Sequence, residues 1–173
     1  IQIAKAGVYQ VDLHRAQPKL ERPPTDSSQI SKARIGVWTF DQPTPNLKLE
    51  GKAALAPSPF GQALSLTGPD DYATVPRSPE TNFSIASFTI SFWIKPAELR
   101  KSGILAAGNV DYVHGWFVDM PDNRGTLRFE TAGPDGTPNG TLRTPPGVLR
   151  PGVWQHVAIV APRLNQSRIY VNG

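Results

Sequence analysis

The stretch SFTISFWIKP, residues 87–96, has the clearest β-strand pattern of the chain. Its large apolar side chains occupy every second position, at Phe88, Ile90, Phe92 and Ile94. The positions between them hold Thr89, Ser91, Trp93 and Lys95. Because successive side chains of a strand point to opposite faces, the first set is predicted to face a core and the second to face away from it.

Short runs of the same kind recur on both sides of this stretch, each bounded by Gly, Pro, Asn or Asp. They are IGVWTF (35–40), QALSLT (62–67), DYATV (71–75), GILAAG (103–108), GWFVDM (115–120), GTLRFET (125–131), GTLRTP (140–145), VWQHVAIVA (153–161) and SRIYVNG (167–173). No segment keeps the spacing of an amphipathic helix. The pattern therefore predicts an all-β fold, an antiparallel β-sandwich.

Composition narrows the class of protein. The 173 residues suffice for one domain with a core, and 39% hydrophobic content without a long apolar run predicts a soluble, globular chain with no membrane insertion. The chain has no cysteine, which excludes disulfides, thiolate metal sites and cysteine nucleophiles. No secretory leader opens it, so we expect a mature or internal piece of a protein.

The net charge of +4 does not indicate nucleic-acid binding. Residues 1–34 hold six Lys or Arg against three acids, and the remaining 12 basic and 11 acidic groups nearly balance. A phosphate-binding surface needs a clustered basic stripe with interleaved aromatic residues, which the body of the chain lacks. We therefore expect no nucleic-acid partner.

The N-terminal part differs in character from the rest. Residues 1–16 contain one alternating strand pattern, GVYQVDLH, which we expect to be the last strand of a preceding domain. Residues 17–34 are polar and Pro-rich and predict a linker. Residues 35–173 are predicted to form the sandwich domain.

The order of the runs resembles the laminin G-like jelly roll of the concanavalin A-like lectin/glucanase superfamily. The matching segments are GVWTFD (36–41), FGQALSLTGPDDYATVP (60–76), SFTISFWIKP (87–96), GWFVDM (115–120), LRFET (127–131), PGVWQHVAIV (151–160) and RIYVNG (168–173). The resemblance implies a jelly roll with further closing strands. Because the sequence stops at Gly173, we expect a domain that is C-terminally incomplete.

Asp70 and Asp71 follow Gly68 and Pro69, a combination typical of a tight turn. Adjacent carboxylates can also supply oxygen ligands to calcium, which takes six to eight. The sequence thus leaves two alternatives for these acids, a structural turn or a calcium site.

The acids and histidines do not form a catalytic pattern. Glucanases that share the resembled fold carry closely spaced acids of the form Glu-x-Asp-x-Glu, as general acid and nucleophile. The glutamates here are isolated, and Asp119 and Asp122 in VDMPDN come nearest. The histidines are far apart, at 14, 114 and 156, and His156 is predicted to be structural. We therefore expect this domain not to be an enzyme.

The segment GNVDYVHGWFVDM holds the richest polar and aromatic cluster of the sequence. The predicted ligand-binding residues are Asn109, Asp111, Tyr112, His114 and Trp116. Sugar binding needs flat apolar faces beside a few orienting polar groups, which this set offers. The alternative is an ordinary loop before a strand whose Trp116 packs inward. Trp38, Trp93 and Trp154 are predicted to be structural, with Trp38 in the core.

These observations predict a non-catalytic glycan-binding accessory module of a larger secreted or cell-envelope protein. Its partners would be a polysaccharide or glycan and a neighbouring domain of the same polypeptide, in an extracellular, periplasmic or cell-surface location. The first alternative is a structural or interaction domain that packs on a parent enzyme of the sulfatase or glycoside hydrolase type. The second is a glycoside hydrolase.

Overall fold

The computed structural model describes residues 9–11, 36–41, 47–76, 87–107, 115–132, 138–161 and 167–173. The chain divides into two compact units. The first, here the sandwich unit, combines Ile1–Ala16 with Phe83–Gly173, and the second, here the hairpin unit, is Gln17–Asn82. Throughout the described ranges the regular elements are strands.

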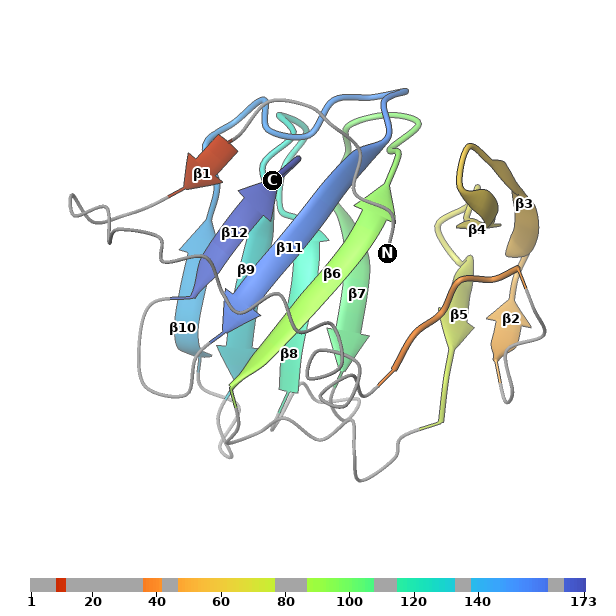
Figure 1. Cartoon of the computed structure of the whole chain (residues 1–173), viewed down its shortest axis with the longest axis horizontal. Helices are drawn as coiled ribbons and strands as arrows, with labels where there is room; N and C mark the ends of the chain where they lie inside the picture. Colours follow the sequence, from red (N-terminus) through yellow and green to blue (C-terminus); the bar gives the residue numbers. More distant parts are fainter. Residues whose placement is uncertain are drawn as a thin grey trace, which may run out of the picture. The chain divides into compact units, whose positions relative to one another are not determined.

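One sheet of the sandwich unit has the strand order β1-β12-β11-β6, and all its neighbours are antiparallel (Figure 1). The strands are β1 (Tyr9–Val11), β12 (Arg168–Val171), β11 (Gln155–Ala161) and β6 (Phe88–Ile94). The predicted strand in residues 87–96 is therefore confirmed, and it pairs with β11 along its full length without a register shift.

The second sheet of this unit has the order β10-β9-β8-β7, again antiparallel. Its strands are β10 (Pro138–Arg143), β9 (Arg128–Ala132), β8 (Gly115–Met120) and β7 (Ser102–Ala107). The register shifts between Gly103 and Leu105 in β7 and between Pro138 and Gly140 in β10, so both outer strands are irregular.

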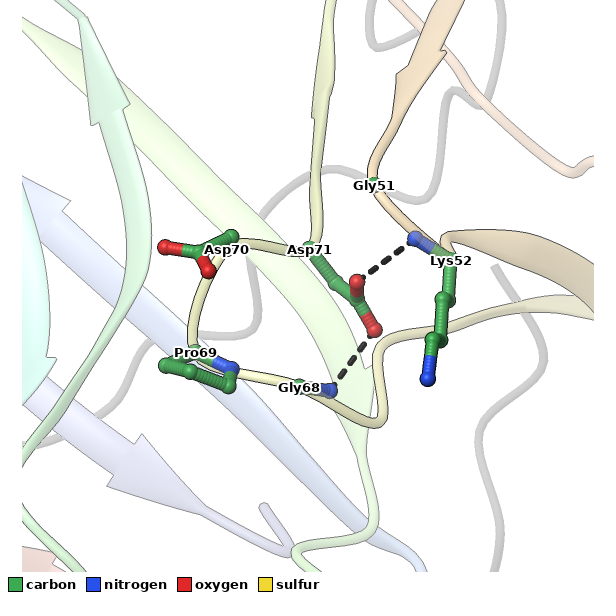
Figure 2. Close-up of a pocket in the computed structure, with 6 residues that line it drawn as sticks. All are labelled: Gly51, Lys52, Gly68, Pro69, Asp70 and Asp71. Carbon is green, nitrogen blue, oxygen red and sulfur yellow. Dashed lines mark hydrogen bonds between the residues drawn. The ribbon is translucent and has the colours of Figure 1, made fainter.

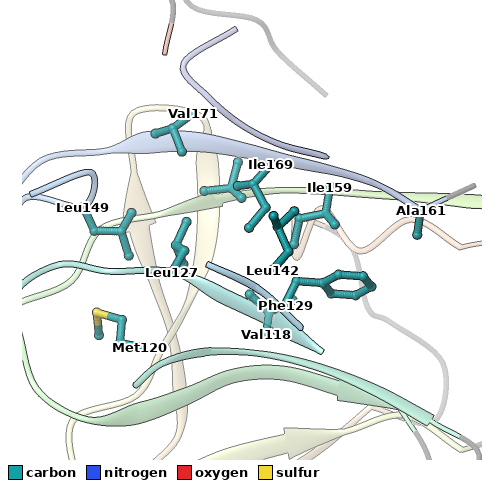
Figure 3. Close-up of a cluster of buried hydrophobic side chains, with 11 residues drawn as sticks. Val118, Met120, Leu127, Phe129, Leu142, Leu149, Ile159, Ala161, Ile169 and Val171 are labelled. Carbon is teal, nitrogen blue, oxygen red and sulfur yellow. The ribbon is translucent and has the colours of Figure 1, made fainter. Parts of the chain in front are cut away.

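The core lies between these two sheets (Figure 3). It is formed by Val118, Met120, Leu127, Phe129, Leu142, Leu149, Val157, Ile159, Ala161, Ile169 and Val171. The apolar side chains of β6 pack against it, and the rings of Phe88 and Phe129 meet edge to face at 6.3 Å. Burying each large side chain contributes about 1.5–3 kcal/mol. The predicted antiparallel β-sandwich is thus confirmed.

The described part of the hairpin unit contains two antiparallel strand pairs. β2 (Lys48–Glu50) pairs with β5 (Tyr72–Thr74), and β3 (Ala54–Ser58) pairs with β4 (Gly61–Ser65). None of its described residues is buried. The predicted core position of Trp38 is therefore wrong: its side chain is 43% exposed and residues 36–41 form no strand.

The N-terminal segment contributes β1, whose Tyr9 lies opposite Val171 of β12. The origin of residues 1–16 in a preceding domain stays a prediction, as do the other domain boundaries. The predicted linker, residues 17–34, lies outside the described residues. The described part of the chain holds no helix long and apolar enough to span a membrane.

Candidate functional site

The carboxylate of Asp71 stabilises a turn of the hairpin unit. Its Oδ1 accepts a hydrogen bond from the Lys52 amide at 2.7 Å. Its Oδ2 accepts from the amides of Thr67 and Gly68, each at 2.7 Å, and from the Thr67 hydroxyl at 3.1 Å. These bonds, first of all that from Lys52, lower the pKa of Asp71 to about 2. Gly51, with φ 69°, passes so close that a Cβ would lie 2.6 Å from Oδ1.

A pocket of about 250 Å³ lies at this turn, lined by Gly51, Lys52, Gly68, Pro69, Asp70 and Asp71 (Figure 2). The two carboxylates point in different directions, that of Asp71 toward the amides and that of Asp70 away from them. The described residues hold no group of three or more His, Asp or Glu that could bind a metal. Both oxygens of Asp71 accept hydrogen bonds from backbone amides, which is the arrangement of the structural-turn alternative. Metal binding by Asp70 and Asp71 stays a prediction.

Most of the predicted ligand loop lies outside the described residues, namely Asn109, Asp111, Tyr112 and His114. Trp116 belongs to β8 and packs against the core, with its ring centroid 6.1 Å from that of Phe88. Trp116 therefore packs inward, as expected if the segment is an ordinary loop followed by a strand. A role of Trp116 in ligand binding stays a prediction.

The outer face of the second sheet carries a cluster of side chains of which the sequence analysis singled out Asp119 alone. Arg128 on β9 forms a bidentate ion pair with Asp119 on β8, at 2.9 and 2.6 Å. Its Nη1 lies 3.6 Å from Glu130 Oε2, which accepts a hydrogen bond from the Thr141 hydroxyl of β10 at 2.9 Å. The guanidinium also lies over the ring of Phe117, 4.9 Å from its centroid. We call these five residues the strand-face cluster.

Strand alternation explains the strand-face cluster. Val118 and Met120 of β8 are buried, so Phe117 and Asp119 point to the opposite side. Asp119 lies directly opposite Arg128 in the antiparallel register, which brings their charges together. The hydrogen bonds from Arg128 to Asp119 raise the pKa of the guanidinium, which therefore stays charged.

The two acids nearest to a catalytic pattern are each held by an arginine. Asp119 is bound by Arg128, and Asp122, in the turn after β8, accepts hydrogen bonds from the Arg124 amide and guanidinium. The contact with the Arg124 amide is the largest of those that lower the pKa of Asp122. β8 ends at Met120, and residues 122–124 form a bend. Each carboxylate thus has a structural partner.

His156 lies on the outer face of the first sheet. Its Nε2 is 2.7 Å from the Ser91 hydroxyl, and its ring centroid is 5.2 Å from that of Trp93. Burial lowers the pKa of the imidazole, so the ring is neutral near pH 7. The contact between Ser91 and His156 joins the neighbouring strands β6 and β11. The pair serves packing and hydrogen bonding between strands.

The two packed antiparallel sheets define the class of this protein as an all-β jelly-roll sandwich. A family model of the laminin G type, described as the Concanavalin A-like lectin/glucanases superfamily, matches residues 67–173. The match covers more than half of the chain, which therefore belongs to this superfamily. No curated protein matches the chain.

Proposed function

We propose that the chain is a non-catalytic glycan-binding module and that the strand-face cluster contacts the glycan. The observation that carries the proposal is the fixed row of Asp119, Arg128, Glu130 and Thr141 beside an aromatic ring. Membership in a lectin and glucanase superfamily supports it. One fold hosts many functions, so the argument rests on the site.

The cluster offers the chemistry that sugar hydroxyls require. Carboxylates accept hydrogen bonds from neighbouring hydroxyls, and guanidinium groups donate to them. In the described part of the chain the hydrogen bond and ion pair of Glu130 use Oε2, and a ligand would approach Oε1. Arg143 of β10 lies directly opposite Arg128, on the same face, and is exposed. Glu130 and Arg143 would contact the sugar, while the ion pair of Asp119 and Arg128 would keep the neighbouring side chains in position.

The biological setting belongs to the same proposal. An accessory module of this kind would bring a larger secreted or cell-envelope protein to its polysaccharide, with a neighbouring domain of the same polypeptide beside it. Any catalytic reaction would then belong to that parent protein. In the present domain Asp119 and Asp122, the two acids that come nearest to the glucanase pattern, each form an ion pair with an arginine.

The test is a thermal-shift screen of the purified chain against neutral and acidic oligosaccharides, followed by calorimetric titration of each hit. A ligand that binds only the folded state raises the midpoint by mass action. We expect Glu130→Gln and Arg143→Gln each to weaken binding about tenfold, the loss of one charged hydrogen bond. Glu98→Gln is the matched control, since Glu98 is an exposed acid that pairs with Arg100. Binding that is unchanged in Glu130→Gln and Arg143→Gln would contradict this site, and no sugar-dependent shift would contradict the function.

A further inference from the structure

The first sheet presents a second and chemically different surface. The core-facing side chains of β6, β11 and β12 alternate with side chains that point outward, as the pairings of His156 with Trp93 and of Ala158 with Tyr170 show. We call six of these outward residues the aromatic face, namely Trp93, Lys95, Trp154, His156, Arg168 and Tyr170. The three strands that carry it lie side by side in Figure 1.

The rings of the aromatic face are held in place by their neighbours. Trp93 packs against His156, and the Lys95 ammonium lies 5.6 Å from the centre of the Trp154 ring. His156 is fixed in turn by Ser91. Side chains ordered in advance lose little conformational entropy on binding. Trp, Tyr and Arg are also the residue types that dominate binding energy at protein interfaces.

The charges that the described residues place on this face have a single sign. The charged side chains that the described parts of β6, β11 and β12 and their flanks place there are those of Lys95 and Arg168. The acids in the described part of the sandwich unit lie elsewhere, at Glu98, Asp119, Asp122 and Glu130. The complementary partner therefore supplies carboxylates.

We propose that the aromatic face docks a polypeptide segment that combines acidic with apolar side chains. Its carboxylates meet Lys95 and Arg168, and its apolar side chains pack beside the ordered rings. Stacked sugars or bases need free ring faces, whereas Trp93 and Trp154 already contact His156 and Lys95. A polypeptide can instead use ring edges and the tyrosine hydroxyl. This surface is separate from the strand-face cluster, so the proposal does not depend on glycan binding.

The test is selection of a random 12-residue peptide library on the immobilised chain, followed by fluorescence anisotropy with the enriched peptides. We expect enrichment of sequences that place Asp or Glu beside Leu, Phe or Tyr. The double variant K95E/R168E should lose at least about tenfold in affinity, because two attractive charges become repulsive. The matched control is Lys101→Glu, which reverses an exposed cation directly before β7 of the other sheet and should bind these peptides as the unmodified chain does.

Three outcomes would overturn the proposal. The first is the absence of acidic and apolar enrichment. The second is equal affinity of the enriched peptides for the unmodified chain and a double variant that shows the same cooperative unfolding. The third is binding of polygalacturonate or of oligo-dT at this face in place of peptide, measured as a loss of that binding in K95E/R168E but not in Lys101→Glu. Glycan binding through Glu130 would be untouched by any of these results.

Discussion

Removal of one partner of the Arg128–Asp119 ion pair tests whether the strand-face cluster stabilises the sheet. The side chain of Asp119 is 13% exposed and that of Arg128 is 21% exposed. Breaking a fully buried pair costs about 3–5 kcal/mol, and an exposed pair contributes about 0–1 kcal/mol. Asp119→Asn keeps the shape of the side chain, and Arg128 keeps its contact with Glu130 at 3.6 Å. We therefore expect Asp119→Asn to lower the free energy of unfolding by about 2 kcal/mol, a value between these limits.

Urea unfolding measures this loss directly. With a slope of about 2 kcal/mol per molar for a domain of this size, the midpoint should fall by about 1 M. A double-mutant cycle with Arg128→Met isolates the pair, and we expect a coupling energy of about 1.5 kcal/mol. The control is Glu98→Gln, because Glu98 and Arg100 are 68% and 47% exposed and should show almost no effect.

The result that would refute the reasoning is a coupling energy no larger than that of the Glu98–Arg100 pair. Such a result would mean that water screens the cluster as fully as it screens an exposed pair. Added salt gives a second check. Screening should weaken the exposed pair and leave the half-buried one nearly unchanged.

Three further predictions concern other parts of the chain. Ile159→Ala should lower the free energy of unfolding by about 2–5 kcal/mol, because the side chain is fully buried between the sheets; urea unfolding checks it, and a loss below 1 kcal/mol would contradict the packing. The carboxyl group of Asp71 should titrate with a pKa near 2 rather than 3.8 in a carbon NMR titration. The stabilisation from its hydrogen bonds is then lost only as the pH falls from 3.8 through 2. An ordinary pKa would contradict the hydrogen bonds described for this turn. The folded state holds the pKa of His156 below 6.5, so the unfolded state binds its proton first and the stability of the protein should decrease as the pH falls below 6.5. His156→Phe should remove this part of the pH dependence. The same change of melting temperature between pH 7 and 5 in both proteins would count against the prediction.

The sequence predicts those parts of the fold in which local alternation decides the structure. Phe88 to Ile94 alternate without interruption, and the strand, its inward face and the sandwich follow from that. The turn at Asp71 follows from its neighbours Gly68 and Pro69. Trp38 shows where alternation is not enough. An apolar residue in a strand-like run becomes buried only if another surface packs on it, and no described residue of the hairpin unit is buried.

The strand-face cluster could not be found from local patterns. Asp119 and Arg128 each look like an ordinary polar position within an alternating run. Their pairing depends on the register between β8 and β9, which no short motif specifies. The usable signal was an acid and a base on the outward positions of two consecutive strands joined by a turn.

The irregular register of β7 and β10 affects how the protein behaves at high concentration. Both outer strands of the second sheet carry a break in the ladder, and β10 also carries Pro138 there. Such breaks prevent a strand of another molecule from pairing along the whole length. β6 ends the described part of the first sheet and its pairing with β11 has no break over seven residues. Self-association by strand addition is therefore directed to β6, and a charge or proline placed on its outer edge is the simplest way to keep the domain soluble.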